Sequence, residues 1–287
     1  MDEARVTSTN SIRLSLVGLA LWASAATGQP VDEIFGPFAN LLDRHVVAVE
    51  TDEGGRIAAF DYAGALEADG TGSLLDRQDG LLAGFDQASL DAREQALAFW
   101  INAYNYFMIS HVLRQAEADG ELVNGVKDFG SLFNPFAVFR RKRFDVGGRD
   151  YSLDGIEKGI LFGDEFALRG WFDPRVHFAV NCASVGCPPL RARPYRSATI
   201  DAQLDDNTRR SLATDLHLRI EGKTVFWSSL FDWYEDDFKV GYDSVRDFVA
   251  AHVPPARARA VRAADRVRIL DYDWALNRPG HFDTLDR

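Results

Sequence analysis

The sequence predicts an α+β fold: a single domain with one buried central helix packed against antiparallel or mixed strands. Residues 96–113 are apolar almost all round, which is typical of a helix covered on every side. Two glycine-containing turns, at 147–148 and 221–223, each separate two β-prone runs and indicate hairpins. Helices and hairpins follow one another without regular βαβ alternation, which favours α+β over a doubly wound sheet.

Hydrophobic periodicity and turn residues predict the elements in chain order. The first half contains an opening helix over 31–49, short helices near 63–68 and 74–82, and the central helix, which begins at a Ser89 N-cap. The second half contains a hairpin over 143–152, a helix over 154–161, a strand over 176–180, a helix over 199–212, a hairpin over 216–227, a helix over 243–252 and a strand over 267–270.

Residues 1–25 have the pattern of a secretory signal peptide. Leu14–Trp22 is apolar but is shorter than the roughly 20 residues that a membrane-spanning helix needs. Ala23-Ser24-Ala25 is a small-x-small triplet that predicts cleavage after Ala25. We therefore expect an exported protein, periplasmic or secreted, without stable membrane insertion after cleavage. A helical extension over 26–60 and a C-terminal tail over 278–287 flank the main domain.

Charge and cysteine content limit the classes of function. The formal net charge of −11 repels phosphate backbones, so we expect no nucleic acid as a partner. Two cysteines are too few for a four-thiolate zinc site or an iron–sulfur cluster. We predict no metal and no cofactor, and no protein partner follows from the residues.

Residues 176–190 concentrate the reactive side chains, because His177, Cys182 and Cys187 all lie there. A cysteine attacks as the thiolate, which a nearby imidazolium or backbone N–H groups would stabilise. The small residues at 183, 184 and 186 would let backbone donors form an oxyanion hole. On an ideal strand His177 and Cys182 point to opposite faces, so a direct dyad needs a bend. An oxidising compartment makes a Cys182–Cys187 disulfide the competing interpretation.

Six segments resemble, in order and spacing, the bacterial domain-of-unknown-function 547 family. They are Phe99-Trp100-Ile101-Asn102-Ala103-Tyr104-Asn105, Tyr151–Glu157, Asp173–Ala179, Asn181–Leu190, Phe231–Phe238 and Tyr272–Asn277. The resemblance implies a family domain over 61–277 and points to Cys182 as the more important thiol. The Cys and His content favours a distant likeness to cysteine hydrolases.

Two hypotheses of function remain open. The first is a thiol-dependent enzyme, a cysteine hydrolase, a transferase or a thiol exchanger, acting on a peptide or a small thiol. Its catalytic residues would be Cys182, His177, Glu157 and Asn102, with Glu157 or Asp273 fixing the imidazole. Its substrate-binding residues would be Asn105, Ser184, Trp100 and Tyr104. The second is a non-enzymatic binding module with a structural Cys182–Cys187 disulfide, in which the buried polar residues form a network.

Overall fold

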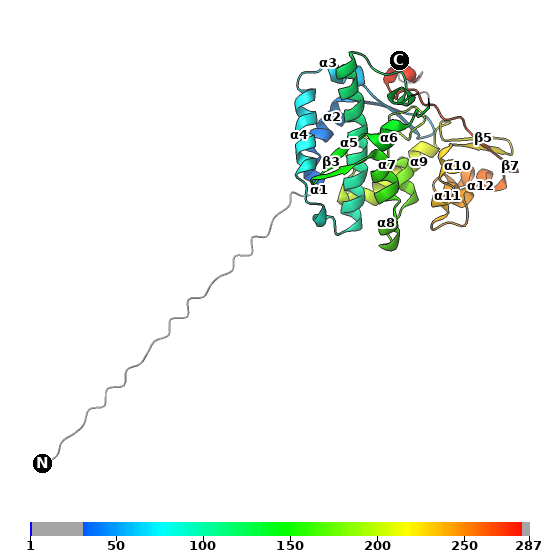
Figure 1. The fold of residues 1–287 in the computed structure, drawn as a ribbon. Helices are drawn as coiled ribbons and strands as arrows, with labels where there is room; N and C mark the ends of the chain where they lie inside the picture. The colour runs from blue at the N-terminus through cyan, green and yellow to red at the C-terminus, as the bar shows by residue number, and fades with distance from the viewer. Residues whose placement is uncertain (2–30, 132, 283–287) are drawn as a thin grey trace.

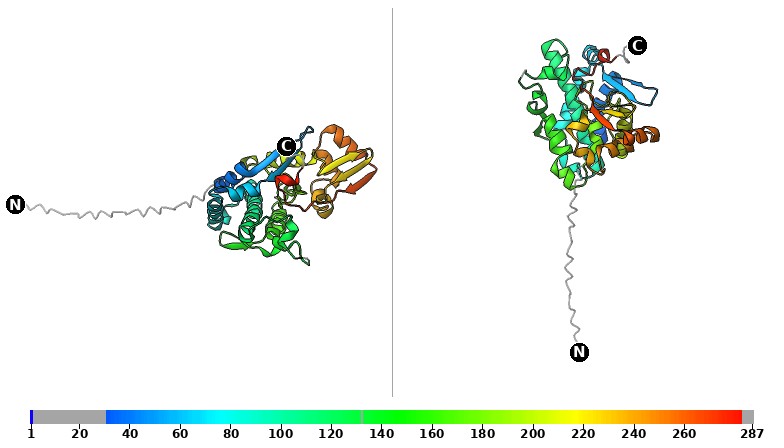
Figure 2. Two further views of the ribbon diagram at one scale, coloured as in Figure 1. Left: turned by 90° about the horizontal axis from the view of Figure 1, so that it is seen from above. Right: turned by 90° about the vertical axis from the view of Figure 1, so that its right-hand side faces the viewer.

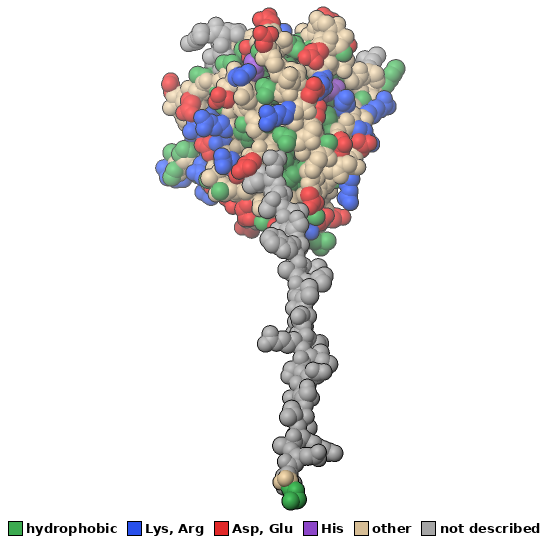
Figure 3. Space-filling view, turned by 90° about the vertical axis from the view of Figure 1, so that its left-hand side faces the viewer, with side chains coloured by type: hydrophobic (Ala, Val, Ile, Leu, Met, Phe, Trp, Pro, Cys, Tyr) green, Lys and Arg blue, Asp and Glu red, His purple; other side chains and the backbone are tan. Residues whose placement is uncertain are grey.

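The computed structural model describes Met1, residues 31–131 and residues 133–282. Residues 2–25 of the predicted signal peptide, residues 26–30 of the predicted extension and residues 283–287 of the predicted tail lie outside the described residues. Within the part that is described, no helix is both long enough and apolar enough to cross a membrane. Figure 3 shows acidic and basic side chains interspersed over one face of the molecule.

The predicted central helix is confirmed as α5 (Arg93–Asp119), and every residue from Ala96 to Ser110 is buried. Ser89 is not its N-cap. Its hydroxyl donates to the carbonyl of Asp86 at 2.6 Å, inside a short 3-10 turn over 87–89, and the cap position of α5 is Ala92. The helix therefore begins after a separate turn, because the serine is already used there.

Helices supply most of the packing around α5 (Figure 1). They include α1 (Val31–Ile34), α3 (Tyr62–Glu67), α7 (Leu153–Ile156) and α9 (Ile200–Leu212). Strand β3 (Phe144–Val146) also reaches the helix, since the ring of Phe144 stacks on Phe107 at 4.4 Å. The α+β class is confirmed, and the helix is enclosed because it is apolar on every side.

The opening helix ends earlier than predicted. Helix α2 (Gly36–His45) stops at His45, and β1 (Val46–Glu50) pairs antiparallel with β2 (Arg56–Phe60). The three valines at 46, 47 and 49 favour extended backbone because they are β-branched. The helical period predicted over 31–49 therefore stops where this valine-rich run begins.

A three-stranded sheet lies at the opposite end of the molecule from α4 (Thr71–Ala83), as Figures 1 and 2 show. Strands β5 (Leu218–Glu221) and β6 (Thr224–Trp227) form the predicted hairpin, and β7 (Arg266–Ile269) pairs parallel with β6. Helices α11 (Val245–Ala251) and α12 (Pro255–Ala263) connect the hairpin to β7, and α12 was not predicted. This end has its own hydrophobic cluster, next to the larger cluster around α5.

The remaining elements are short. Strand β4 (Arg149–Tyr151) pairs with β3 and completes the predicted hairpin, whose turn is formed by Gly147 and Gly148 at φ 58° and 74°. The short helices are α6 (Ala137–Arg141), α8 (Asp164–Leu168) and α10 (Leu230–Trp233). Helix α7 continues as a π-helical segment, Glu157–Leu161.

The strand predicted over 176–180 is wrong, because Pro174–Phe178 forms a 3-10 helix. Asp173 starts this helix, since its carboxylate accepts from the backbone N–H of Arg175 at 3.0 Å. The same carboxylate lies 2.6 Å from the guanidinium groups of Arg93 and Arg175. This cap overrides the β propensity of the valines and phenylalanine that follow. Because the segment is not a strand, His177 and Cys182 need not point to opposite faces.

Candidate functional site

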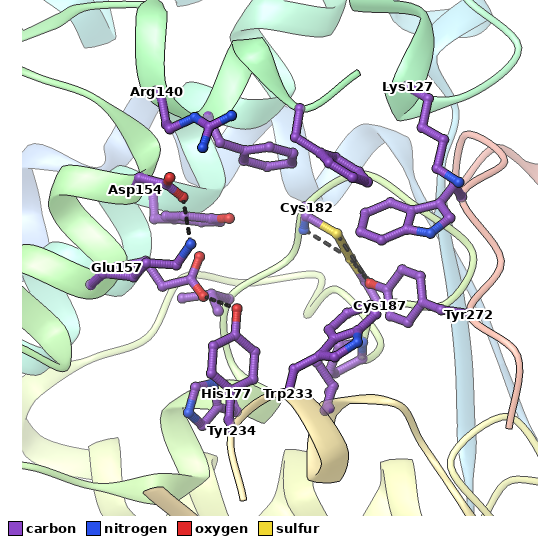
Figure 4. Close-up of a pocket in the computed structure, with 18 residues that line it drawn as sticks. Lys127, Arg140, Asp154, Glu157, His177, Cys182, Cys187, Trp233, Tyr234 and Tyr272 are labelled. Atoms are coloured by element: carbon purple, nitrogen blue, oxygen red, sulfur yellow. Dashed lines mark hydrogen bonds and ion pairs between the residues drawn. A yellow bond between two sulfur atoms is a disulfide. The ribbon is translucent and has the colours of Figure 1, made fainter. Parts of the chain in front are cut away.

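A pocket of about 580 Å³ opens where the two hydrophobic clusters meet. This volume is within the usual range for small-molecule sites. The pocket is lined by residues from α5, from 127–140, from 154–158, from 177–188, from α10 and from 272–274: Tyr104, Lys127, Phe136, Phe139, Arg140, Asp154, Glu157, Lys158, His177, Val180, Cys182, Cys187, Pro188, Leu230, Trp233, Tyr234, Tyr272 and Trp274. Figure 4 shows Asp154 and Glu157 on one side of it and the two sulfurs with Tyr272 on the other.

Cys182 and Cys187 form a disulfide, and both residues line the pocket. Their Cα atoms are 6.3 Å apart, within the range of protein disulfides. Cys182 is half-buried, whereas Cys187 is only 6% exposed. A molecule in the pocket would therefore reach the sulfur of Cys182 more easily.

Hydrogen-bond donors surround the less exposed sulfur. The backbone N–H of Cys182 donates to Sγ of Cys187 at 2.9 Å. The hydroxyl of Tyr272 lies 3.2 Å from each sulfur and accepts from the Ser184 hydroxyl at 3.1 Å. Burial raises the pKa of the Tyr272 hydroxyl far above its ordinary value, so the phenol keeps its proton and remains a donor.

The backbone between the cysteines is strained at one residue. Ala183 has φ 63°, the only positive φ of a non-glycine residue in the described chain. Its N–H donates to the Asn181 side chain at 2.9 Å, and its carbonyl accepts from the N–H of Asn277 at 3.0 Å. Gly186 lies under the ring of Tyr272, where a Cβ would be 3.0 Å from ring carbons. The loop is thus held in a shape that brings the tyrosine to the sulfurs.

Buried amides fix this loop from behind. Asn105 of α5 donates to the carbonyl of Ala179 at 2.9 Å and accepts from the N–H of Asn181 at 2.7 Å. Asn181 donates to the carbonyl of Pro188 at 2.8 Å and accepts from the Asn277 side chain at 3.0 Å. Asn105 therefore holds the cysteine loop and does not line the pocket.

His177 is held by Asp237, with Nε2 and Oδ2 2.8 Å apart. Its ring is stacked between Phe162 at 3.9 Å and Tyr234 at 4.1 Å, and the residue is 2% exposed. The prediction that Glu157 or Asp273 fixes the imidazole is wrong, because a residue 60 positions away does so. Among the described residues, no hydrogen bond joins His177 to Cys182.

Glu157 instead accepts a hydrogen bond from the hydroxyl of Tyr234 at 3.1 Å. It is 8% exposed and begins the π-helical segment, in which the N–H of Phe162 donates to its carbonyl at 2.9 Å. Burial, and then the nearby Glu157, raise the pKa of the Tyr104 and Tyr234 hydroxyls well above the ordinary value. Both phenols therefore stay neutral beside the carboxyl group.

The structure brings some predicted site residues together and separates others. Cys182, His177, Glu157 and Tyr104 line one pocket, and Ser184 contacts both sulfurs at 3.1 and 3.3 Å. Asn102 lies elsewhere, because both of its hydrogen bonds, 2.8 Å each, go to the backbone of Tyr195. Trp100 packs on Phe99 and Tyr151, away from this pocket.

Two backbone donors of the predicted oxyanion hole are already used within the structure. The N–H of Ala183 is bonded to Asn181, and the N–H of Gly186 donates to the carbonyl of Asp273 at 2.9 Å. Within residues 31–131 and 133–282, no group of three or more His, Cys, Asp or Glu side chains is arranged to hold a metal ion.

Sequence reasoning missed several site residues, and five of them lie in the C-terminal part of the chain: Trp233, Tyr234, Asp237, Tyr272 and Trp274. A signal for them existed, since all five stand in the two C-terminal motifs that resemble the family. The Trp233 and Trp274 rings stack at 5.7 Å and form one wall of the pocket.

Residues 88–212 match a family model described as "Protein of unknown function, DUF547". Neither a curated protein nor a solved structure matches the chain. The matched range contains α5, Glu157, His177 and the disulfide, whereas the pocket wall around Trp233 and Tyr272 follows it. Over residues 88–212 the chain is therefore similar to the DUF547 family.

Proposed function

We propose that this protein carries out thiol–disulfide exchange, with the Cys182–Cys187 disulfide as the reacting group and a small thiol or thiol-containing peptide as its partner. One observation carries the proposal: the disulfide lines a pocket, and its less exposed sulfur is surrounded by donors, the nearest being the N–H of Cys182 at 2.9 Å. Donors at this sulfur favour its departure as a thiolate.

The reaction begins with attack of the partner's thiolate on Sγ of the half-buried Cys182. A new S–S bond forms between them, the Cys182–Cys187 bond breaks, and the electron pair of that bond leaves on Cys187. A second partner thiolate then attacks the partner's sulfur in the mixed disulfide and releases Cys182 as a thiolate. Two electrons pass from two partner thiols, which become one disulfide, to the protein disulfide; the reverse sequence oxidises the protein.

Tyr272 and the backbone N–H of Cys182 stabilise the charge that forms on Cys187. The phenol keeps its proton because burial raises its pKa, so it donates to the thiolate at any pH near neutrality. Ser184 donates to Tyr272 and thereby orients the phenol proton toward sulfur. In this proposal Ser184 is a positioning residue.

His177 is the proposed base for the incoming thiol, because it lines the same pocket and its ring is fixed by Asp237. Cysteine-hydrolase chemistry has less support, since it needs a direct pairing of thiol and imidazole. In the described residues His177 bonds to Asp237 and not to Cys182.

We place the reaction outside the cytoplasm. The support is the apolar run Leu14–Trp22 followed by Ala23-Ser24-Ala25, a pattern that directs export. Disulfides persist in oxidising compartments, which agrees with the disulfide of the cysteine loop. Detection of a mature N-terminus at Ala26 in an exported fraction would test this location.

The main test is the reduction potential of the disulfide, measured by equilibrating the folded protein in thiol–disulfide buffers and counting alkylated thiols by mass. An exchange protein should give a value between roughly −120 and −270 mV. The single variants supply a second readout: Cys187→Ser, with the more accessible thiol left, should form a mixed disulfide about tenfold faster than Cys182→Ser. A potential below about −300 mV, or equal rates in both variants, would overturn the proposal.

The alternative is a binding module in which the disulfide only shapes the pocket wall. The observation that favours it is the buried position of Cys187, 6% exposed, together with the aromatic wall of Trp233 and Trp274. A disulfide of that kind should resist millimolar thiols until the protein unfolds. The reduction potential of the disulfide, measured as described for the main test, decides between the two functions.

A further inference from the structure

Glu157 is the one buried carboxylate among the pocket residues, and it has no cationic partner. The residue is 8% exposed, and the ion pairs of the described chain do not include it. Its nearest polar partners are the neutral phenols of Tyr234, at 3.1 Å, and Tyr104. A buried carboxylate is costly unless a positive charge or strong donors compensate it.

None of the three basic side chains of the pocket forms an ion pair with Glu157 in the described chain. Lys158 pairs with Asp154 at 3.1 Å, and Arg140 donates to the side chain of Asn134 at 2.9 Å. Lys127 is exposed, and its ammonium lies over the ring of Trp274 at 5.4 Å. None of them neutralises Glu157, so a cationic ligand would supply a charge that the carboxylate lacks among the described residues.

The surroundings of Glu157 suit an ammonium group. Tyr104 and Tyr234 direct their hydroxyls at the carboxylate, and a phenol oxygen can also accept a hydrogen bond from an ammonium group. Glu157 also begins a π-helical segment, a rare backbone form that is frequent at functional sites. A ligand carboxylate or phosphate would be repelled at this point of the pocket by the charge of Glu157.

We propose that the pocket binds a primary ammonium group at Glu157, so that the thiol partner is an aminothiol or a peptide thiol with a free amino group. The choice of a thiol rests on the proposed function, whereas the ammonium site does not. Figure 4 shows Glu157 on one side of the pocket and the disulfide on the other. A ligand with its amine at Glu157 and its sulfur at Cys182 would span the pocket.

The first experiment measures binding without exchange. S-methylcysteamine has an ammonium group but no thiol, and its N-acetyl derivative lacks the charge; each is titrated into the oxidised wild-type protein and followed by calorimetry and tryptophan fluorescence. The amine should bind at least about tenfold more tightly, because a charge-assisted hydrogen bond contributes on that scale. Equal affinities, or no binding of either compound, would overturn the ammonium site.

Two variants locate the effect. Glu157→Gln keeps the shape and an acceptor for Tyr234, and it should remove the preference for the amine. Glu117→Gln, on the exposed surface of α5, is the matched control and should keep it. If Glu157→Gln does not fold, the pair of probes on the wild-type protein still decides the proposal. A preference that persists in a folded Glu157→Gln variant would contradict it.

The second experiment separates this inference from the proposed function. Reduction rates with cysteamine and N-acetylcysteamine are each divided by the rate of the same thiol on a small reference disulfide, which cancels intrinsic reactivity. We expect cysteamine to be favoured about tenfold in the wild type and not in Glu157→Gln. Exchange without that preference would refute the ammonium site alone; amine binding with no exchange would refute the exchange function alone.

Discussion

Two asparagines of α5 provide a matched test of how the cysteine loop is held. Asn102 and Asn105 are 1% and 3% exposed, and each makes two hydrogen bonds to backbone groups. The partners differ: those of Asn102 belong to Tyr195, whereas those of Asn105 lie just before Cys182. The substitutions Asn102→Ala and Asn105→Ala therefore remove similar interactions from different segments.

Both variants should lose similar stability. Each leaves one buried N–H and one buried carbonyl without a partner, and each such group costs about 1–3 kcal/mol, hence about 2–6 kcal/mol in total. Water entering the vacated space restores part of this, so we expect a loss of about 2–4 kcal/mol in the free energy of unfolding. Urea unfolding of the oxidised proteins measures it through the midpoint and the slope.

Only Asn105→Ala should change the chemistry of the loop. Without its anchor the loop opens more often, and the rate at which a small thiol reduces the disulfide should rise about tenfold in conditions where the protein is folded. Asn102→Ala should stay within about twofold of the wild type, since it releases a different segment. Equal rates in the two variants, or a stability loss below about 1 kcal/mol for Asn105→Ala, would refute this account of the network.

Three further predictions concern single side chains. Tyr272→Phe should slow reduction of the disulfide about tenfold by removing a donor to sulfur, while Tyr234→Phe should not, in the same thiol assay. Burial lowers the pKa of His217 to about 4, so the free energy of unfolding should fall as the pH drops from about 6.5 to 4, because the unfolded chain binds a proton that the folded chain excludes. His217→Leu should remove roughly 2–3 kcal/mol of that fall, measured by urea unfolding at several pH values. An unchanged dependence of stability on pH in this variant would contradict the prediction. Asp173→Asn should lower the free energy of unfolding by about 3–5 kcal/mol, because two arginines lose their carboxylate partner. The control Asp201→Asn removes a carboxylate whose side chain is 56% exposed and should lower it by less than about 1 kcal/mol; thermal unfolding measures both.

Local patterns predicted the parts of the fold that depend on local interactions. The apolar run of α5 and the paired glycines at 147 and 148 each needed only neighbouring residues, and both predictions are confirmed. The strand predicted at 176–180 failed because a side-chain cap from Asp173 outweighs the β propensity of the residues after it. Propensity describes a segment alone, and a cap with two arginine partners changes its surroundings.

The site was predicted in its components and not in its pairings. Cysteine, histidine and glutamate were identified by residue type, and three of the four predicted catalytic residues do share a pocket. The partner of His177 is 60 positions away, and Tyr272 lies 90 positions from Cys182, so no spacing rule could join them. Asn102 and Asn105 lie three residues apart on α5, and only the tertiary contacts show that one holds Tyr195 and the other the cysteine loop.

The C-terminal segment is as much a part of the cysteine site as the loop itself. Backbone hydrogen bonds of 2.9–3.0 Å join Val185 to Ala275 and Ala183 to Asn277, and Tyr272 reaches the sulfurs from the same segment. These contacts hold the loop in its observed shape. Since α5 holds the opposite side of the loop, the disulfide lies between the first and last parts of the domain, and its reactivity depends on both.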